Sequence, residues 1–577
     1  MRLNSLKAIV KTALRGAAVL LLGAGVAPAQ QTINLSAGPT TATLPDGSAV
    51  TMWGYTCGAV VSTASATCAA LNPAATGWSP VVITVPVATT GSTSLTINLT
   101  NSLTFGANSV PTSLTIVGQL GGGLGTTATT TPSPAHGVQG TTWPIVGGTG
   151  PADSTFTPPV QGNRVQSFST EVAAGATTAL TWASLRPGTY LIESGTHPSI
   201  QGTMGLYGVL VVTSAPVGTT AGTAYPAAGT APAVTYNAEI PMLFGEIDPV
   251  QNNAVSAAVG TTGFSETMPW SGQPGGCGNP TSSTYHQCYP PTVNYTPLYY
   301  TINGVAFNKT AATGSLFPAT SVTATAGTGK VLVRLVNAGS RMHVPSVVGS
   351  QTQQLAAGNT TGTTVNGFSL IAEDGNPLPG LPRVQSEVFM AAGKTYDVMI
   401  NAPAAAAPAL PIFDRELSLS ANATGHDAGM LAYLNINGSL LSAAPMGAAV
   451  ARNDSYASVV TGQTLTVSDP SKGVIANDTN VYGVQLVGTV AGLTLNADGT
   501  FTYTGAPTTF TYCANGTVSG STCSSGITAT VNLGAATIEA SGGIICSGSS
   551  FTSTTVTLRP LPARKLRLTV TAALKVP

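Results

Sequence analysis

The sequence predicts an all-β protein that folds as several β-sandwiches joined by turns, and three observations carry this prediction. The chain is rich in Gly, Thr, Ala, Val and Ser and contains 40 prolines, a composition that favours strands and turns over helices. Hydrophobic residues make up 43% of the chain and recur in strand-sized runs, unlike the pattern of a disordered chain. Its 577 residues are enough for several domains.

The charge balance excludes one class of partner. Charged residues make up only 7% of the chain, and Lys plus Arg equals Asp plus Glu at 20 each. A nucleic-acid-binding protein normally shows a basic excess or a basic face. We therefore expect no nucleic-acid partner, and the sequence leaves the actual partner unknown.

Residues 1–29 are expected to be an export signal. Basic residues up to Arg15 precede a short apolar run at 16–26, and small residues at 27–29 suit cleavage before Gln30. The run is too short to span a membrane comfortably, and no later segment reaches about 18 uninterrupted apolar residues. The mature protein is expected to be secreted or at the cell surface, with the periplasm as an alternative, and to lack a transmembrane segment.

The cysteines fit an oxidising compartment. They fall into three close pairs, each able to close a small loop, with one cysteine left over. Metal binding is the alternative, although no pair has the tight C-x-x-C spacing of a zinc site. The disulfide candidates are Cys57 with Cys68, Cys277 with Cys288, and Cys513 with Cys523, and Cys546 remains unassigned.

Strands are expected first at 32–35, 48–58, 81–85 and 92–101. In the last of these, Leu95, Ile97 and Leu99 alternate with polar residues, as in a half-buried strand. Further strands are expected in this region at 165–172, 177–182, 189–192 and 208–212. Residues 121–162, which include His136, are rich in Gly, Thr and Pro and are expected to form a loop, and 214–235 to form a linker.

Residues 236–442 carry a second series of strand-like motifs. They include Tyr300-Thr-Ile-Asn-Gly304, Val331-Leu-Val-Arg-Leu-Val-Asn-Ala-Gly-Ser340, Phe368-Ser-Leu-Ile-Ala-Glu-Asp-Gly-Asn-Pro377 and Gly393-Lys-Thr-Tyr-Asp-Val398. Asp374-Gly375 predicts a tight turn between two of these strands.

Taken in order, these motifs resemble the first two domains of multicopper oxidases. The four motifs are similar to the family's I-N-G-x-x-F, R-L-R-L-I-N-A-G-S, V-I-A-x-D-G-x-P and G-x-R-Y-D-V segments. Residues 188–190 and 204–208 are similar to its G-T-Y-W-Y-H-S-H and M-x-G-L-Y-G. The resemblance implies two cupredoxin-like Greek-key sandwiches, at 30–213 and 236–442.

The pattern of strand-like motifs changes after residue 449. Leu493 to Tyr503 predicts a hairpin around Asp498-Gly499, with Leu493, Leu495, Phe501 and Tyr503 on one face. Residues 449–560 resemble immunoglobulin-like or cadherin-like modules of bacterial surface proteins. Residues 561–577 are expected to be an irregular tail, and a truncated or frame-shifted gene end would explain both that tail and Cys546.

The resemblance also implies copper, but the expected ligands are missing. Family members use H-x-H pairs around a three-copper cluster and a blue copper site with two histidines and a cysteine. Thr115-Ile116-Val117 stands at the family's H-W-H, and Glu193 and Gly195 stand at its H-S-H. The third cupredoxin domain, with its H-C-H, is not found in the sequence. The five histidines, none in an H-x-H pair, are His136, His197, His286, His343 and His426.

The sequence leaves open copper binding at partial occupancy, with His197, Met204 and Glu193 as candidate ligands, because copper(I) accepts imidazole and thioether. The alternative places Met204 in the core and His197 on a surface loop. We expect His343 in a core and the other histidines at exposed positions.

No sequence motif points to other chemistry. The chain lacks a G-x-S-x-G elbow, a phosphate-binding loop and an H-E-x-x-H segment. Glu246 and Asp248 are expected to be structural. The acidic and amide residues of the last module suit turns better than a calcium loop; they are Asp469, Asn477, Asp478 and Asp498.

The sequence therefore predicts a secreted protein like a multicopper oxidase that has lost most copper ligands and acts as a surface scaffold or binding protein, with no catalytic residues assigned. The alternative is a copper-dependent oxidoreductase acting on phenols or metal ions, with ligands supplied by another chain or by a missing C-terminal region.

Overall fold

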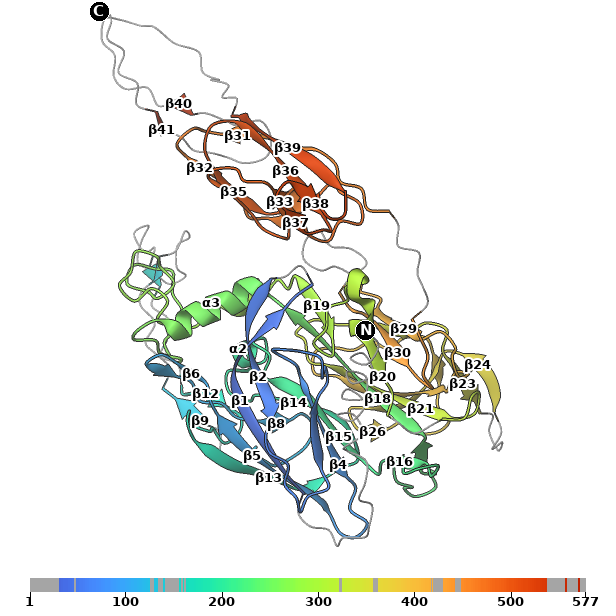
Figure 1. Ribbon diagram of the computed structural model, residues 1–577. Helices are drawn as coiled ribbons and strands as arrows, with labels where there is room; N and C mark the ends of the chain where they lie inside the picture. Colours follow the sequence, from blue (N-terminus) through green and yellow to red (C-terminus); the bar gives the residue numbers. More distant parts are fainter. Residues whose placement is uncertain are drawn as a thin grey trace, which may run out of the picture.

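The computed structural model describes residues 31–45, 48–124, 129–132, 139–140, 155–156, 159, 162–320, 324–355, 362–416, 418, 429–441, 448–536, 556–557 and 569–570. The predicted export signal, most of the predicted tail, His136, His426 and Cys546 lie outside these residues. Within them the protein is almost entirely β-structure, as predicted (Figure 1).

The first sandwich is built from two facing sheets. One sheet has the strand order β13-β5-β1-β2, and the other has the order β3-β4-β15-β14-β8. Their bounds are β1 (Gln31–Thr43), β2 (Ala49–Cys57), β3 (Thr67–Ala70), β4 (Val81–Pro86), β5 (Thr93–Asn101), β8 (Thr115–Ile116), β13 (Thr177–Leu185), β14 (Gly188–Glu193) and β15 (Tyr207–Thr213).

Strand β5 shows how the sequence builds this core. Leu95, Ile97 and Leu99 are fully buried in the apolar cluster between the sheets, which confirms the predicted alternation. Each such side chain contributes about 1.5–3 kcal/mol by leaving water. On the other face, the Thr96 hydroxyl lies 2.9 Å from that of Thr181 on the adjacent strand, so the polar side of the strand is also paired.

The second sandwich has a larger sheet of order β19-β18-β21-β28-β25-β26, with β27 also paired to β25, and a smaller sheet of order β20-β30-β29-β22. The predicted turn is present: Asp374 and Gly375 have φ values of 50° and 69° between β25 and β26. The bounds are β18 (Ala238–Ile247), β19 (Tyr299–Ile302), β20 (Leu316–Pro318), β21 (Lys330–Asn337), β22 (Pro345–Val347), β25 (Phe368–Glu373), β26 (Asn376–Pro377), β27 (Val384–Gln385), β28 (Thr395–Asn401), β29 (Leu410–Asp414) and β30 (Leu431–Asn435).

A helix that the sequence did not predict, α3 (Pro249–Gly260), follows β18. The Asp248 carboxylate accepts hydrogen bonds from the first-turn amides of Val250 and Gln251, and Pro249 suits the first helical position. The helix lies across the first sandwich (Figure 1) and adds Val255 and Val259 to that sandwich's core. The alanine-rich turns and the Asp-Pro start carried the signal for this helix.

A buried arginine joins the two sandwiches. Arg334 on β21 binds Glu239 at 2.7 Å and Asp397 at 3.2 Å, and it donates to the Thr189 hydroxyl of β14 at 2.8 Å. An apolar cluster that includes Met52, Trp78, Tyr207, Leu243 and Val336 also draws residues from both sandwiches. The predicted linker contains the hairpin β16 (Gly222–Tyr225) and β17 (Val234–Tyr236), and Tyr225 donates to Asp397 at 2.6 Å.

The third unit is a smaller two-sheet arrangement, drawn apart from the others in Figure 1, with the orders β31-β39-β36-β33 and β32-β35-β34. Leu493 pairs with Tyr503 and Leu495 with Phe501, which confirms the predicted hairpin. The bounds are β31 (Asp454–Val459), β32 (Thr464–Val467), β33 (Val484–Val487), β34 (Leu493–Leu495), β35 (Phe501–Thr504), β36 (Thr508–Ala514) and β39 (Thr528–Ala535).

Short elements complete the described chain. They are α2 (Pro198–Gln201), η1 (Thr292–Asn294), η2 (Lys309–Ser315), η3 (Pro470–Lys472), β6 (Thr104–Phe105), β7 (Asn108–Ser109), β9 (Thr129–Thr131), β10 (Gln139–Gly140), β11 (Thr155–Phe156), β12 (Arg164–Ser167), β23 (Gln351–Gln354), β24 (Thr363–Asn366), β37 (Val518–Ser519), β38 (Thr522–Cys523), β40 (Val556–Thr557) and β41 (Thr569–Val570).

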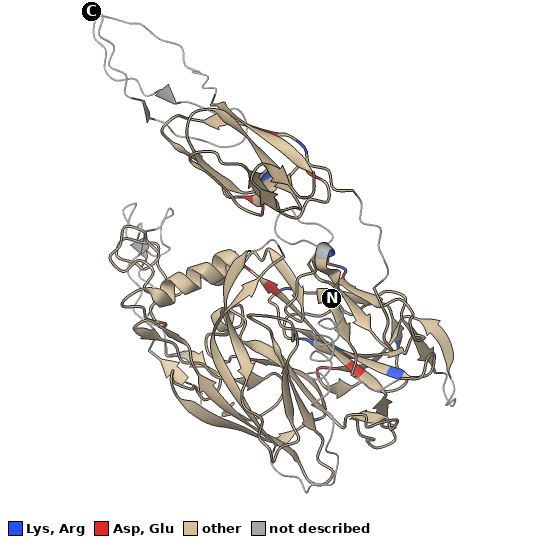
Figure 2. Ribbon diagram, viewed as in Figure 1, with Lys and Arg blue, Asp and Glu red and all other residues tan. Residues whose placement is uncertain are grey.

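All three predicted disulfides are present: Cys57–Cys68, Cys277–Cys288 and Cys513–Cys523. Lysines, arginines and carboxylates are sparse on the ribbon and form no broad single-sign stretch among the residues drawn in colour (Figure 2). None of the helices in the described ranges is long and apolar enough to cross a membrane.

Candidate functional site

The two segments that stand at the family's histidine pairs meet in the first sandwich. Strand β8 pairs with β14 so that Thr115 lies opposite Glu193 and Ile116 opposite Ile192. A Cβ atom on Gly195 would lie 2.7 Å from Cγ2 of Thr115 and 3.2 Å from Oγ of Ser113. With the Thr115 and Ser113 side chains in place, the junction leaves no space at residue 195 for a side chain, least of all an imidazole.

Hydroxyl groups fill the space around this junction. Ser113, Ser167 and Thr196 are buried, and their side-chain oxygens lie 3.0–3.1 Å from one another. Ser167 also donates to the Ser169 carbonyl at 3.0 Å. These hydroxyls bond to one another, and Thr196 also reaches the Glu171 carboxylate at 3.2 Å, so the network extends beyond the junction.

The residues at this junction do not fit the copper cluster that the resemblance implies. Copper clusters of that kind are held by imidazoles, and neutral serine and threonine hydroxyls are poor copper ligands. The nearest ionisable side chain in the paired strands, Glu193, has its pKa raised by burial, which disfavours the charged form that a metal would need. No step of oxygen reduction can be derived from this donor set.

The three predicted copper candidates lie in different surroundings. Met204 is fully buried in the apolar core of the first sandwich. Glu193 ends β14 and raises the pKa of buried Tyr55, secondary to burial itself. His197 stands at the start of α2 and faces Glu266 from the segment after α3, with 3.8 Å between Nε2 and Oε2. No hydrogen bond or ion pair joins the three side chains to one another within the described residues.

The His197 side chain instead belongs to a polar cluster between α2 and the loop after α3. Gln166 donates to Glu266 at 2.9 Å and lies 3.3 Å from Glu171, and Thr196 lies 3.2 Å from Glu171. Burial, reinforced by the neighbouring Glu171, raises the pKa of Glu266 to about 7. Burial also raises the pKa of Glu171 and lowers that of His197.

His343 occupies a second buried polar site, in the second sandwich. It is fully buried, which confirms its predicted core position, but its partners are charged. Its Nδ1 lies 2.7 Å from Asp414 and its Nε2 lies 2.9 Å from Glu246. Burial alone would lower the pKa of His343, but the hydrogen bonds and charges of the two carboxylates raise it to about 9, so His343 is an imidazolium at neutral pH.

Glu246 and Asp248 have the structural roles that were predicted. Glu246 accepts hydrogen bonds from the backbone amides of Ser340 and Arg341 at 3.0 and 2.9 Å as well as binding His343, and Asp248 caps α3. His286, expected to be exposed, is partly buried and has φ of 65° in the disulfide-closed loop. No group of three or more His, Cys, Asp or Glu side chains in the described ranges is arranged to hold a metal ion.

Comparison with solved structures finds copper oxidases among the matches, at low similarity. Similar solved structures include a blue copper oxidase from Nitrosomonas europaea, with a TM-score of 0.39, 15% identity, and coverage of 70% of this chain and 86% of that one. A laccase from Botrytis aclada matches with a TM-score of 0.37 and 16% identity, and the match covers 73% of this chain and 55% of the laccase. A multicopper oxidase from Pseudomonas thermotolerans matches with a TM-score of 0.36 and 13% identity, and the match covers 88% of this chain and 100% of that one. Likeness at this level assigns no activity to this chain.

Comparison of the sequence with known proteins does not assign this chain to a family. No protein-family profile matches the chain, and no curated protein sequence matches it.

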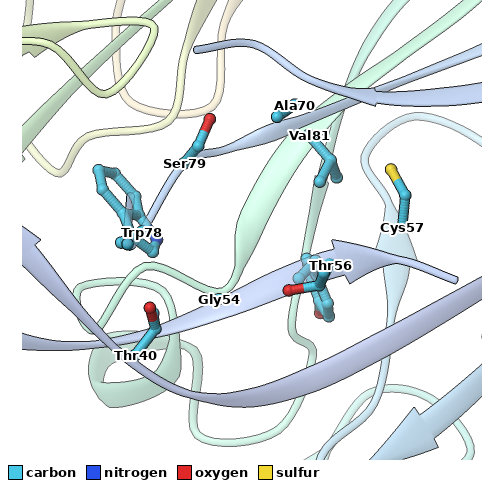
Figure 3. Close-up of a pocket in the computed structure, with 10 residues that line it drawn as sticks. Thr40, Gly54, Thr56, Cys57, Ala70, Trp78, Ser79 and Val81 are labelled. Carbon is cyan, nitrogen blue, oxygen red and sulfur yellow. The ribbon is translucent and has the colours of Figure 1, made fainter. Parts of the chain in front are cut away.

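A pocket of about 180 Å³ opens on the other side of the first sandwich (Figure 3). Its walls combine the Trp78 ring with small and hydroxyl side chains; they are Thr40, Gly54, Tyr55, Thr56, Cys57, Ala70, Gly77, Ser79 and Val81. Tyr55 is the one titratable side chain that lines it apart from the disulfide-bonded Cys57, and burial raises its pKa well above the usual value. The pocket therefore offers no acid or base for chemistry near neutral pH.

Sequence reasoning missed the surroundings of His197, namely Glu266, Glu171 and Tyr289, whose ring lies 5.6 Å from the His197 ring. They come from segments about 25 to 90 residues away in the chain, so no local spacing could place them together. The partners of His343 were missed for the same reason, since Glu246 and Asp414 are separated from it by 97 and 71 residues.

Proposed function

We propose that this chain uses two cupredoxin-like sandwiches of the multicopper oxidase type as an exported scaffold or binding protein, and that it does not by itself carry out copper-dependent oxidation. The third unit is an immunoglobulin-like module in this proposal. A shared fold does not establish a shared activity, so the proposal depends on the residues at the site.

One observation carries the proposal. The β8–β14 junction holds Thr115, Ser113 and Gly195, and its hydroxyls bond to one another and to neighbouring groups. Converting this junction to a copper site would require several imidazoles where the small residues Ser113, Thr115 and Gly195 now pack together. This supports loss of the ligand set at that place, rather than a small rearrangement of an intact one.

Copper loading of the purified mature chain, beginning at Gln30, tests the proposal. After loading and desalting, we expect no blue absorption band and no oxygen uptake with phenols or ferrous iron. Several tightly held coppers per chain, a blue band, or oxygen uptake by the chain alone would overturn it. Size-exclusion chromatography of the same sample shows whether chains associate, so that activity confined to an oligomer would identify ligands shared between chains.

Export is tested separately. Expression of the full-length chain with its own N-terminus should yield an extracytoplasmic protein whose first residue is Gln30. Recovery of uncleaved protein in the cytoplasm would contradict the location while leaving the copper result unchanged.

A further inference from the structure

A buried side-chain amide bridges two carboxyl groups where the first sandwich meets the segment between β18 and β19. The side-chain nitrogen of Gln166 donates to Oε1 of Glu266 at 2.9 Å and to Oε1 of Glu171 at 3.3 Å. Gln166 is 8% exposed, and its amide group has two N–H donors, one for each carboxyl group. Because both oxygens contact the same nitrogen atom, the two carboxyl groups are close neighbours.

Little positive charge is available to offset these two groups. Within the described ranges, the one basic side chain at ion-pair distance is that of His197, whose Nε2 lies 3.8 Å from Oε2 of Glu266. Burial lowers the pKa of His197, so its ring is neutral around pH 7. Tyr289 also faces the cluster, with its ring 5.6 Å from that of His197, and burial raises its pKa well above the usual value, so its hydroxyl is neutral as well.

The cluster joins two different parts of the chain. Gln166, Glu171 and His197 come from the first sandwich, whereas Glu266 comes from the segment between β18 and β19. In that segment Phe264 packs against the core of the first sandwich. We call residues 262–289 the docked loop.

The docked loop is held together internally and presents exposed rings. The disulfide Cys277–Cys288 closes it, and its side chains of Trp270 and Tyr285 are 47% and 40% exposed. The contact at Glu266 therefore influences how this part of the surface is presented.

We propose that the docked loop is a pH-sensitive latch, closed against the first sandwich while the Glu266 carboxyl group is protonated and opening more often once this group ionises beside Glu171. Two negative charges held close together away from water repel each other and are poorly solvated. A protonated Glu266 avoids that cost and still accepts the hydrogen bond from Gln166 at its carbonyl oxygen. Local opening returns both groups to water, as low-stability segments do in other proteins.

The direction of the pH effect follows from the two titrating partners. Burial, reinforced by Glu171, raises the pKa of Glu266 from 4.5 to about 7, so the closed state loses stability as the pH rises through 7. The lowered pKa of His197 acts in the opposite direction below its usual value of 6.5, because protonation there favours the open state. With both effects included, we expect opening to increase about tenfold between pH 5 and 8.

Hydrogen exchange of the mature chain at pH 5, 6, 7 and 8 tests the latch. After correction for the intrinsic exchange rate at each pH, protection of peptides from the docked loop should fall about tenfold over this range. Peptides covering β5 in the core of the first sandwich should keep their protection. Constant or rising protection of the docked loop would overturn the inference, and an equal fall in β5 would do so too, because it would mean a global loss of stability.

Two variants assign the effect to its groups. Glu266→Gln preserves the contact with Gln166 without a titrating group, and most of the fall should disappear. His197→Asn removes the opposing proton and should make the fall larger; Asn tolerates the left-handed backbone of His197, which has φ of 40°.

Glu416→Gln is the matched control, because it makes the same change at an exposed carboxylate of the second sandwich, and it should leave the profile unchanged. A fall that persists in folded Glu266→Gln would overturn the inference. The wild-type profile tests the latch even if a variant does not fold. The inference is independent of the proposed function, because it concerns the contact beside α2 and not copper chemistry.

Discussion

The buried imidazolium of His343 should make the second sandwich lose stability as the pH rises above neutrality. Its two ring nitrogens face Asp414 and Glu246 at 2.7 and 2.9 Å, and only the protonated ring can donate to both. The carboxylates raise its pKa from 6.5 to about 9. Because the folded state holds the proton more tightly than the unfolded state, the stabilisation is full below pH 6.5 and is lost as the pH rises through 9.

The size of the effect follows from that shift. A pKa raised from 6.5 to about 9 corresponds to about 3 kcal/mol of stabilisation at low pH, and about 2 kcal/mol of it should disappear between pH 7 and 9. The pKa of Asp414 is lowered, so its own contribution is constant over this range. Urea unfolding at four pH values from 6 to 9 measures the change, and hydrogen exchange of peptides covering β22 and β29 localises it.

His343→Gln is the control, because glutamine keeps a donor but does not titrate. The variant should be destabilised at pH 7 by about 3–5 kcal/mol, since it leaves buried carboxylates without a cation, and its stability should no longer fall between pH 7 and 9. If the wild-type stability stays constant or rises over this range, or if the variant keeps the same slope, then His343 does not carry the charge assigned to it.

Three further changes test other parts of the structure. Arg334→Met should destabilise the contact between the sandwiches by about 3–5 kcal/mol, because it leaves two buried carboxylates unpaired; a melting temperature equal to wild type would contradict this. Gly195→Ala places a Cβ atom 2.7 Å from the Thr115 side chain and should cost about 1–3 kcal/mol by overpacking, with partial recovery when Thr115→Ser is added; additive effects in the double variant would refute the contact. Replacing Cys277 and Cys288 together by serine should cost about 3 kcal/mol for a loop of this length and increase protease cleavage of the loop, whereas unchanged cleavage would show that other contacts hold it.

Local patterns in the sequence predicted much of the fold. Alternation in β5, the Asp374-Gly375 turn and the paired cysteines each depend on neighbouring residues, and each is present in the structure. Helix α3 was missed because its signal, an Asp-Pro start before small residues, is short and lies in a strongly β-prone chain. Its burial against the first sandwich depends on tertiary packing that no local pattern encodes.

The surroundings of the buried polar residues His197 and His343 could not be predicted from local sequence patterns. The sequence identified His197 as a candidate ligand but joined it to Met204, a neighbour in the chain that packs in the core. The carboxylate that faces its Nε2, Glu266, comes from the segment between β18 and β19. Likewise, His343 was expected to pack in a core, and its charge became visible only with the two carboxylates beside it.

Metal content of the mature chain tests the central claim most directly, namely that the sandwiches persist without the copper chemistry of the proteins they resemble. The chain should be loaded with copper, desalted, and analysed by elemental analysis together with visible absorption. We predict at most one copper ion per chain and no blue band. Several coppers per chain with a blue band would contradict the account.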